Sequence, residues 1–368
     1  MNSQQIERDL FVKEIKEKYP DNYQMGLKFG DLGVTVSAND KDIIKGLKAY
    51  FNGFVVEDKP VFKGDSIHVS AHEGAPPMFD FPFAIKQPDP GKEKIKEEWS
   101  DLKDGRVVRK KLTGMTYVFG RSENGSVDNV VVGPCLKNLN QVINFINNRH
   151  IEWALCRGCV LGHAAGIILN GKGIAMAGFS GAGKSTFALH MMSKGATFVS
   201  NDRLMVEKTA KGLRMHGVAK LPRINPGTIL NNENLSNLIS DEEKEEFREL
   251  SMEELWKLEQ KYDAPIDTCF GENRFALSWP MHGLIILNWK HNGGPLVVNE
   301  VDPAKRQDLL PAFMKETGLF FWPETRCDKP DYLKETYVDF LKRCRMWEFS
   351  GGIDFEKATA ACIELVAV

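Results

Sequence analysis

A glycine-rich stretch in the middle of the chain has the residue types and the spacing that hold a polyphosphate. It reads Gly178-Phe-Ser-Gly-Ala-Gly-Lys-Ser185, after a short apolar run and before a segment that favours a helix. Glycines let the backbone wrap closely around phosphate groups, so that amides and the N-terminus of the following helix face the oxygens. A lysine and a hydroxyl at the end of this pattern bind phosphate and Mg2+. The pattern therefore predicts a site for nucleotide phosphates.

Each position of this loop has an expected task in binding ATP and Mg2+. The Lys184 ammonium is expected to hold the β- and γ-phosphates, and the Ser185 hydroxyl is expected to bind Mg2+. The alternative, a chance glycine turn that carries a lysine, is disfavoured by the strand pattern before the loop and the helix pattern after it. The expected nucleotide contacts are Gly178, Ser180, Gly181, Ala182, Gly183, Lys184, Ser185 and Thr186.

A second candidate group follows the helix that the loop opens. Residues 197–200 read as a short strand, and Asn201 and Asp202 come directly after it. Ligands of parallel α/β sheets gather at the carboxyl ends of the strands. Asp202 is therefore expected beside the terminal phosphate, as a second magnesium ligand or as a base for an acceptor hydroxyl. An aspartate in an ordinary turn is the alternative.

One histidine and several basic side chains are candidates for assisting phosphate transfer. Histidine exchanges protons near neutral pH, so His163 could orient a phosphate or move a proton; the alternative is a structural histidine. Arg223 stands with Lys220 in a proline-bounded loop and could stabilise charge on a transferred phosphoryl group; the alternative is a solvated basic loop. Arg203 and Arg274 are weaker candidates of the same kind.

The stretch from His163 to residue 206 resembles the catalytic core of the HPr kinase/phosphorylase family and its related kinases. His163, the glycine loop and the Asn201-Asp202 step resemble, in order and spacing, the His-Gly, P-loop and Asp-Asp elements of that family. A predicted β-hairpin over residues 165–177, which feeds the loop, is similar to the entry into the loop in that family. The resemblance implies an α/β fold with a P-loop kinase core like that of phosphoenolpyruvate carboxykinase. It also implies an activity that depends on ATP and Mg2+.

One residue departs from the family pattern. Asn201 stands where the family has the first aspartate of its pair, to which proton transfer from the acceptor hydroxyl is usually assigned. An amide cannot accept that proton, so Asp202 or His163 takes the role, or the acceptor needs little assistance from a base. Phosphoryl transfer depends mainly on positioning and charge, so loss of the base need not abolish activity. The reverse phosphorolysis reaction and HPr as substrate are not carried over from the family.

The main prediction is a kinase that transfers the γ-phosphate of ATP to a hydroxyl of a protein serine or of a small molecule. The alternative is a nucleotide-dependent switch, favoured by Asn201, in which ATP binding rearranges residues 208–270 to engage a partner without phosphotransfer. A kinase of the adenylylsulfate type shares the loop sequence, but in that group the loop lies near the chain start without a preceding hairpin. A transport ATPase of the ABC type would need a Leu-Ser-Gly-Gly-Gln signature before a later strand, and Phe349-Ser-Gly-Gly-Ile353 lacks the glutamine.

Composition and charge restrict the class of protein. A chain of 368 residues with 42% hydrophobic residues can fill the core of one large domain or of two ordinary ones. The formal net charge of −2 gives no broad basic face, so nucleic acid is not an expected partner. The polar N-terminus lacks the apolar core of a secretory signal, and no run of about 18 apolar residues predicts a membrane span.

The number and spacing of the cysteines indicate the redox state of the cell compartment in which the protein is expected. Seven cysteines are spread over the chain, and this odd number does not suggest a disulfide framework. Cys156 and Cys159 form a lone Cys-x-x-Cys without the second pair that a zinc site needs, and they are expected to be buried thiols. A reducing cytoplasm is the predicted location. HPr kinases assemble as hexamers, so the resemblance allows a homo-oligomer, although no sequence feature indicates an interface.

The elements that must position these residues change in character near residue 150. Residues 1–150 are predicted to form an N-terminal α/β domain of unknown role. Its expected elements are helices over 3–18 and 39–51, a hairpin over 26–36, strands near 53–71 and 106–132, a turn at 122–126, an irregular surface segment at 73–104, and a final helix over 137–155.

Residues 151–368 are predicted to form the nucleotide-binding α/β domain. Residues 241–262 are strongly charged and carry capping boxes that start at Ser240 and Ser251. They predict two short helices, whose charge forms either a solvated face or a surface for a partner. The other expected elements are strands at 284–288 and 296–301 and helices near 303–315, 331–344 and 354–366.

Overall fold

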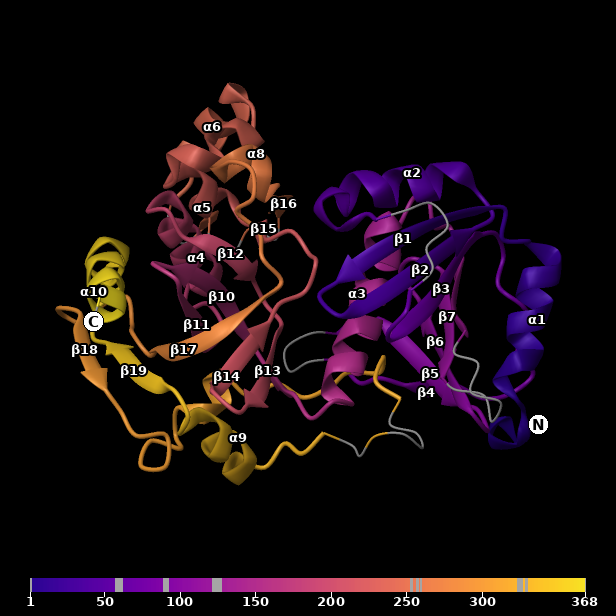
Figure 1. The fold of residues 1–368 in the computed structure, drawn as a ribbon. Helices are drawn as coiled ribbons and strands as arrows, with labels where there is room; N and C mark the ends of the chain where they lie inside the picture. The colour runs from indigo at the N-terminus through magenta and orange to yellow at the C-terminus, as the bar shows by residue number, and fades with distance from the viewer. Residues whose placement is uncertain are drawn as a thin grey trace. The chain divides into compact units, whose positions relative to one another are not determined.

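The structure is a computed structural model with two compact units (Figure 1). Unit 1 consists of Met1–Arg157 and Thr317–Lys329, and unit 2 consists of Gly158–Glu316 and Pro330–Val368. The expected division into folding domains of residues 1–150 and 151–368 stays a prediction. The structure describes the whole chain apart from residues 1, 57–61, 89–92, 121–127, 252–253, 256–257, 259, 323–326, 328–329 and 368.

Unit 1 is built on a mixed β-sheet whose described strands follow the order β1-β2-β3-β8-β7-β6-β5-β4. Strands β2, β3 and β8 run parallel to one another, and the other neighbours are antiparallel. The strands are β1 (Tyr23–Phe29), β2 (Leu32–Ala38), β3 (Ser66–Glu73), β4 (Ala84–Ile85), β5 (Glu97–Asp101), β6 (Gly105–Lys110), β7 (Met115–Gly120) and β8 (Asp128–Gly133).

Helices cover both faces of the unit 1 sheet. Val118 of β7 packs with α1, whereas its neighbour Tyr117 packs against Phe145 of α3. Successive residues of a strand point to opposite faces, so α1 and α3 lie on opposite sides of the sheet. Helix α2 begins where the Asp40 carboxylate accepts the N–H of Asp42 over 2.7 Å. The helices are α1 (Arg8–Lys18), α2 (Lys41–Tyr50) and α3 (Leu139–Leu155), with 3-10 turns η1 (Ser3–Gln5) and η2 (Asn52–Phe54).

A polar network ties α1 to the neighbouring strands β2, β3 and β8. Nδ1 of His68 donates to Oδ1 of Asp128 over 3.1 Å, and Nε2 of His68 accepts from the Ser37 hydroxyl over 2.8 Å. Nζ of Lys16, on α1, lies 3.1 Å from the same Asp128 oxygen. The hydrogen bond from His68 and the charge of Lys16 outweigh the effect of burial and lower the pKa of Asp128. The charged form of this carboxyl therefore holds α1 on the sheet.

Most expected elements of the first 150 residues are confirmed, and two are wrong in part. The predicted hairpin is β1–β2, and the three predicted helices are α1, α2 and α3. Residues 73–104 were expected to be irregular, but β5 lies within them as a strand of the sheet. Its buried side chains, Glu98 and Ser100, are polar, so no apolar alternation marks it in the sequence. The turn expected at 122–126 lies outside the described residues.

The strands expected near 53–71 and 106–132 are only partly where the pattern placed them. Strand β3 begins at Ser66, and the residues before it include the 3-10 turn η2. Strands β6, β7 and β8 fall within the second range. Strands β7 and β8 are almost wholly buried and β6 is buried at half of its residues, which agrees with the apolar residues that marked them.

The segment Thr317–Lys329 belongs to unit 1 although it lies between two stretches of unit 2 in the sequence. The ring of Phe320 packs against Tyr117, Phe119 and Phe145 at centroid distances of 4.9, 5.7 and 5.9 Å. These aromatic contacts bury apolar area against the same face of the sheet that α3 covers. The segment is therefore held on unit 1 by packing as well as by hydrogen bonds.

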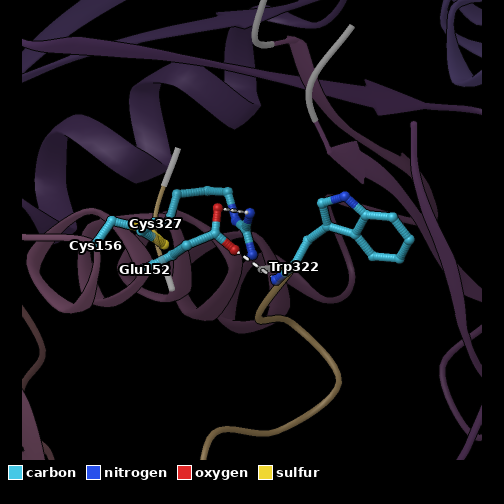
Figure 2. The surroundings of a disulfide bond; sticks show 5 residues. Glu152, Cys156, Trp322 and Cys327 are labelled. Carbon is cyan, nitrogen blue, oxygen red and sulfur yellow. Dashed lines mark hydrogen bonds and ion pairs between the residues drawn. A yellow bond between two sulfur atoms is a disulfide. The ribbon is translucent and has the colours of Figure 1, made fainter. Parts of the chain in front are cut away.

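A disulfide also anchors this segment, between Cys327 and Cys156 at the C-terminal end of α3 (Figure 2). Beside it, Glu152 accepts the backbone N–H of Trp322 over 2.9 Å (Figure 2). The expectation that Cys156 is a buried thiol is wrong, because this cysteine forms the disulfide. The bond could not be predicted, since two cysteines 171 residues apart leave no spacing signal in the sequence. Cys159 is buried as expected. The cysteine count therefore no longer supports a reducing compartment.

Unit 2 is built on a second mixed sheet whose described strands follow the order β12-β10-β11-β17-β14-β13-β9, with β19 on β17 and β18 on β19. The predicted hairpin is β10–β11, and β11 runs parallel to β17, which runs parallel to β19. The strands are β9 (Val160–Gly162), β10 (Ala164–Leu169), β11 (Lys172–Gly178), β12 (Thr197–Ser200), β13 (Leu204–Thr209), β14 (Gly212–His216), β17 (Ser278–Leu287), β18 (Val297–Glu300) and β19 (Arg345–Ser350), with a small pair β15 (Arg223–Ile224) and β16 (Tyr262–Asp263).

The two faces of the unit 2 sheet carry different cores. Met176 of β11 packs in a cluster with Phe187 of α4, and Ala175 packs in a second cluster with Phe313 and with Tyr337 of α9. Helix α4 lies along β10 and β11 and contacts α10 (Figure 1). The helices are α4 (Lys184–Ser193), α5 (Pro226–Leu230), α6 (Asp241–Arg248), α8 (Ile266–Phe270), α9 (Lys334–Leu341) and α10 (Phe355–Ala367), with 3-10 turns η3 (Glu233–Leu238) and η4 (Leu310–Ala312).

The helix expected near 303–315 is wrong. That stretch contains turns and the short 3-10 turn η4, and no α-helix among its residues, all of which are described. In the interior of a helix that began at residue 303, Pro311 would remove one backbone hydrogen bond and its ring would clash with the preceding turn, whereas the first turn of η4 tolerates it. The helices near 331–344 and 354–366 are confirmed as α9 and α10, and the strands at 284–288 and 296–301 as β17 and β18.

The charged segment 241–262 begins as its first capping box predicts. Ser240 and Glu243 exchange the two hydrogen bonds of the box at the start of α6. The box of Ser251 and Glu254 makes the same two bonds, but much of the helix it predicts lies outside the described residues. Within the part of the chain that the structure describes, no helix combines the length and apolar character needed to cross a membrane.

Candidate active site

The glycine loop connects the buried strand β11 to helix α4. Gly183 is the N-cap of α4 and has φ of 80°, a left-handed conformation that favours glycine. A Cβ on Gly183 would also lie 2.7 Å from the Phe355 ring. Gly181 has φ of 80° as well, but the space around it is open. The first N–H groups of α4 have no acceptor within the helix, so the loop presents donors to an anion.

Lys184 folds back over the loop at the first position of α4. Its Nζ donates to the carbonyl oxygen of Gly178 over 3.0 Å, which spans the two ends of the loop. Burial lowers the pKa of Lys184, the charge of Asp202 acts in the opposite direction, and the charge of Lys315 adds to the lowering. Lys184 therefore lies within electrostatic reach of a carboxylate and of a second lysine.

The other expected nucleotide contacts differ in exposure. Ser180 and Gly181 are exposed at the tip of the loop, whereas Ser185 is half-buried at the start of α4. The carbonyl oxygen of Ala182 accepts a hydrogen bond from Nε1 of Trp289 over 2.9 Å, and this bond holds the loop in place. Thr186 shares a hydrogen bond of 2.9 Å with the hydroxyl of Thr228 on α5, so its side chain joins α4 to α5.

Asp202 follows β12 and lies at the same edge of the sheet as the glycine loop. Strand β12 is antiparallel to β10, and β10 is antiparallel to β11, so β11 and β12 end at the same edge. His163 stands between β9 and β10, and its Nε2 donates to Oδ1 of Asp202 over 2.9 Å. Nη1 of Arg203 lies 3.1 Å from Oδ2 of Asp202. The structure thus brings His163, Asp202 and Arg203 together.

These contacts keep the carboxyl of Asp202 ionised. Burial raises the pKa of Asp202, but the hydrogen bond from His163 and the charges of Arg203 and Lys315 outweigh it, and the pKa lies below its ordinary value. A carboxylate with a lowered pKa is a weak base. Its charge is therefore better suited to binding a cation than to removing a proton.

The site also includes two lysines that the sequence analysis did not identify as site residues. Lys315 acts on both Lys184 and Asp202 through its charge, and it comes from the segment that was expected to be helical. Lys220, named only as a neighbour of Arg223, is partly buried, and the charge of Asp202 opposes the lowering of its pKa by burial. No local pattern could have identified Lys315, because it reaches the site through pairing with a distant strand.

Two of the predicted arginines have other partners. Arg223 is exposed, and its Nε lies 3.3 Å from Oδ1 of Asp263 on β16. Its charge lowers the pKa of Lys220, so it lies near the edge of the site. Arg274 donates to the carbonyl oxygens of Met192 and Ala196 and so stabilises the connection from α4 to β12.

Asn201, next to Asp202 in the sequence, has one buried polar atom without a partner among the described residues. This atom is Oδ1 of its side-chain amide. A buried acceptor without a donor costs about 1 to 3 kcal/mol, so such an atom is expected to meet water or a bound molecule.

The residues present fit a magnesium ion bound together with a nucleotide. The Ser185 hydroxyl and the Asp202 carboxylate are oxygen ligands of the kind that Mg2+ prefers, and each carboxylate oxygen keeps a second lone pair beside its present contact. In the described residues no group of three or more His, Cys, Asp or Glu is arranged to hold a metal ion. Mg2+ at a nucleotide takes most of its ligands from phosphate and water, so two protein ligands are enough.

Comparison with known proteins gives little further information. No protein-family model and no curated protein sequence matches the chain. Among solved structures, the HPr(Ser) kinase/phosphatase from Coxiella burnetii is similar, with 12% identity and a TM-score of 0.30, over 56% of this chain and 88% of that chain. A TM-score of this size carries no weight for the fold or the activity. The resemblance to HPr kinase/phosphorylase therefore stays a prediction that depends on the residues of this chain.

Proposed function

We propose that the chain is a kinase that depends on ATP and Mg2+ and transfers the γ-phosphate to a hydroxyl group. The observation that supports this most is the placement of Lys184 and Asp202. Lys184 begins the helix that follows the glycine loop, Asp202 follows β12, and the charge of Asp202 acts on Lys184. An ammonium and a carboxylate at the edge of the sheet where β11 and β12 both end suit a terminal phosphate together with its metal ion.

Each residue has a role in this proposal that its contacts support. The loop amides and Lys184 bind the phosphates, and Ser185 and Asp202 would hold Mg2+, which supplies positive charge to the phosphates when it is bound. His163 orients Asp202 through their hydrogen bond. Arg203 adds positive charge next to the transferred group. Arg223, paired with Asp263, assists only at the edge of the site.

Transfer in this site depends on positioning and charge rather than on a strong base. Asp202 is ionised and engaged by two cationic partners, so it is a poor proton acceptor. The Oδ1 of Asn201 is buried without a hydrogen-bond partner among the described residues, and a turn of this side chain toward the site would let it accept a hydrogen bond from the acceptor hydroxyl and hold its oxygen in place. The asparagine that departs from the family pattern then orients the acceptor instead of taking its proton.

A labelling experiment tests the proposal on the full chain. The protein, ATP labelled at the γ-phosphate, Mg2+ and a cell extract are mixed, and labelled products are separated. We expect product with the wild type and with Lys342→Ala, an exposed lysine just after α9, and none with Lys184→Ala. Equal labelling by Lys184→Ala would rule out the proposed site.

The nucleotide-dependent switch is the second candidate, and Asn201 together with the engaged Asp202 favours it. In a switch, Mg2+–ATP binds but no labelled product forms, and ATP changes the protection of residues 208–270 from hydrogen exchange. Calorimetry with Mg2+–ATP and hydrogen exchange on the same sample separate the two functions. Binding with changed protection but without product would support the switch.

The cytoplasm is the proposed location, because a kinase needs a supply of ATP. The acceptor is proposed to be a small molecule or a protein, without a role for nucleic acid or a membrane. A homo-oligomer is compatible with this proposal, and light scattering of the purified chain would measure its mass.

A further inference from the structure

His72 of β3 is a buried histidine on the face of the unit 1 sheet that α1 covers. Alternate residues of a strand share a face, so His68, Ser70 and His72 point to the same side. That side is the one under α1, because Lys16 of α1 contacts the Asp128 partner of His68. The side chain of His72 is completely buried, and within the part of the chain that the structure describes neither of its ring nitrogens has a hydrogen-bond partner. Such a ring favours its uncharged form.

The carboxylate that faces His72 comes from the connection after α1 and is shared with other groups. Oδ1 of Asp21 lies 3.7 Å from Nε2 of His72, which is longer than a hydrogen bond. Oδ2 of Asp21 accepts the hydroxyl of Ser70 over 3.3 Å and lies 3.9 Å from Nζ of Lys16. Asp21 therefore compensates a charge on His72 only in part.

The charges around the ring do not overcome the effect of its burial. Burial lowers the pKa of His72, and the charge of Asp21 acts in the opposite direction. The charge of Lys16 adds to the lowering, the backbone of Tyr19 opposes it, and the charge of His68 adds to it again. His72 is therefore neutral while α1 lies on the sheet.

The other titratable groups beside His72 do not supply a counter-charge. Asp128 on β8 is engaged by its lysine and histidine partners. Cys135, after β8, donates to the carbonyl of His72 over 3.3 Å, and burial raises the pKa of this thiol to about 12, so it stays uncharged. Glu73 points to the opposite face of β3, where it accepts a backbone N–H over 2.8 Å.

Tyr19 joins this end of α1 to the chain that leaves β3. Its hydroxyl accepts the N–H of Ala75 over 2.9 Å and donates to the carbonyl of the same residue over 3.2 Å. A Cβ on Gly74 would collide with the Tyr19 ring, so the ring lies directly on the backbone there. The N–H of Tyr19 donates to the carbonyl of Ile15 at the end of the helix. Movement of Tyr19 would therefore also release Ala75.

The first turns of α1 are held on the sheet in another way. Phe11, Val12 and Ile15 belong to an apolar cluster with strands β6, β7 and β8. Apolar contacts of this kind do not depend on protonation. The end of α1 and the connection after it, residues 16–21, thus form the part of this region that a charge on His72 would disturb.

We propose that His72 is an acid-sensitive anchor, whose protonation in mild acid releases residues 16–21 from β3 while the first turns of α1 stay in place. In the released form the ring is hydrated and takes its proton from the solvent, with an ordinary pKa of about 6.5. The closed form resists protonation, so its stability is complete above that value and is lost as the pH falls below it. Release also frees Ala75, at the start of the proline-containing segment after β3.

Hydrogen exchange of the full chain, measured amide by amide between about pH 7.5 and 5 and corrected for the intrinsic rate, tests the anchor. The amides of Tyr19, Asn22 and Ala75 donate to Ile15, Ala38 and the Tyr19 hydroxyl and report the release. We expect their protection to fall by up to about tenfold per pH unit below about pH 6.5, because one proton is bound on opening. The amide of Ile15 should keep its protection. Constant protection of Tyr19 over this range would refute the proposal.

Two histidine variants assign the effect. His72→Phe is similar in size and cannot be protonated, so the protection of Tyr19 should no longer change between about pH 7.5 and 5. His68→Gln removes the neighbouring histidine, can still donate to Asp128, and should keep the dependence on pH. A dependence that persists in His72→Phe, or that disappears in His68→Gln, would assign the proton to another group and overturn the role of His72.

The ring signals of the histidines in the wild type give a measurement that does not depend on the folding of a variant. We expect the His72 ring to become protonated only together with the loss of protection at Tyr19. Protonation near pH 6.5 with full protection retained would show that the closed form accepts the charge, and the proposal would then be wrong. The carboxyl of Asp128 does not confuse the result, because its effect lies below the ordinary carboxyl pKa of about 4.

Discussion

Nε2 of His163 and Oδ1 of Asp202 lie 2.9 Å apart, and this hydrogen bond joins two connections of unit 2 whose flanking strands also pair, β9 with β13 and β10 with β12. His163 is fixed between β9 and β10, whereas Asp202 stands in the connection from β12 to β13. A carboxylate that is free to rotate binds a metal ion less well than one held by a second partner. The orientation of Asp202 therefore depends on His163.

Replacing this histidine tests that dependence. We expect His163→Ala to lower kcat/KM for Mg2+–ATP about 10- to 100-fold, as losing the partner of a metal ligand commonly does. His163→Gln can still donate a hydrogen bond and should lose less. Steady-state kinetics at several Mg2+ concentrations would measure the effect, which should appear partly as a weaker response to Mg2+. Unchanged kinetics in His163→Ala would contradict the orienting role.

Two glycines of the loop allow backbone strain to be separated from packing. Gly181→Ala places a Cβ in open space at a left-handed position and should cost about 1 to 2 kcal/mol. Gly183→Ala adds a clash with the Phe355 ring and should cost about 1 to 3 kcal/mol more. The free energy of unfolding of unit 2 in urea would measure both changes. If the clash is the cause, Gly183→Ala should destabilise the Phe355→Ala protein less than it destabilises the wild type. Its cost in that background should approach the cost of Gly181→Ala in the wild type.

The Asp128 network predicts a pH dependence of α1 on unit 1. The pKa of Asp128 is lowered by His68 and Lys16, so its charge stabilises the fold above the ordinary carboxyl pKa, and this stabilisation is lost as the pH falls below that value. Asp128→Asn should therefore destabilise the helix by about 2 kcal/mol at neutral pH. The difference from the wild type should shrink in acid. Hydrogen exchange of Arg8–Lys18, compared between both proteins at each pH, would measure it. A difference that is constant with pH would contradict the role of the charge.

The disulfide predicts a specific pattern of cross-linked peptides. Digestion without reductant should release a Cys156–Cys327 pair, and Cys327→Ser should abolish it. Cys159→Ala changes the other cysteine of the same Cys-x-x-Cys and should leave the pair intact, because Cys159 takes no part in this disulfide. Closing a loop of this size restricts the unfolded chain, so reduction should also lower the melting temperature. Recovery of both cysteines as free thiols from unreduced protein would show that the bond does not form in solution.

Local sequence signals predicted the elements around the site well. The capping residues of α2 and α6 act within three residues of themselves, and the hairpin β10–β11 has a turn that its own residues specify. Such features depend on neighbours in the sequence. They could therefore be predicted without knowledge of the fold.

Features that depend on distant residues could not be predicted in this way. Strand β5 is buried through Glu98 and Ser100, whose polarity conceals it. Lys315 reaches the site because Met314 pairs with Gly162, and Cys156 finds its partner 171 residues along the chain. The same separation explains why the sequence named Arg223 as the assisting cation, although the structure pairs it with Asp263.

The position of Thr317–Lys329 has a practical consequence for anyone who designs truncated versions of the protein. Because this segment packs on unit 1, no single cut in the gene yields either unit intact. A fragment that starts at Gly158 would carry Phe320 without its aromatic neighbours and Cys327 without Cys156. A version of unit 2 alone therefore calls for a short polar linker that joins Glu316 to Pro330 in place of the segment between them. A version of unit 1 alone calls for Thr317–Lys329 to be attached after Arg157.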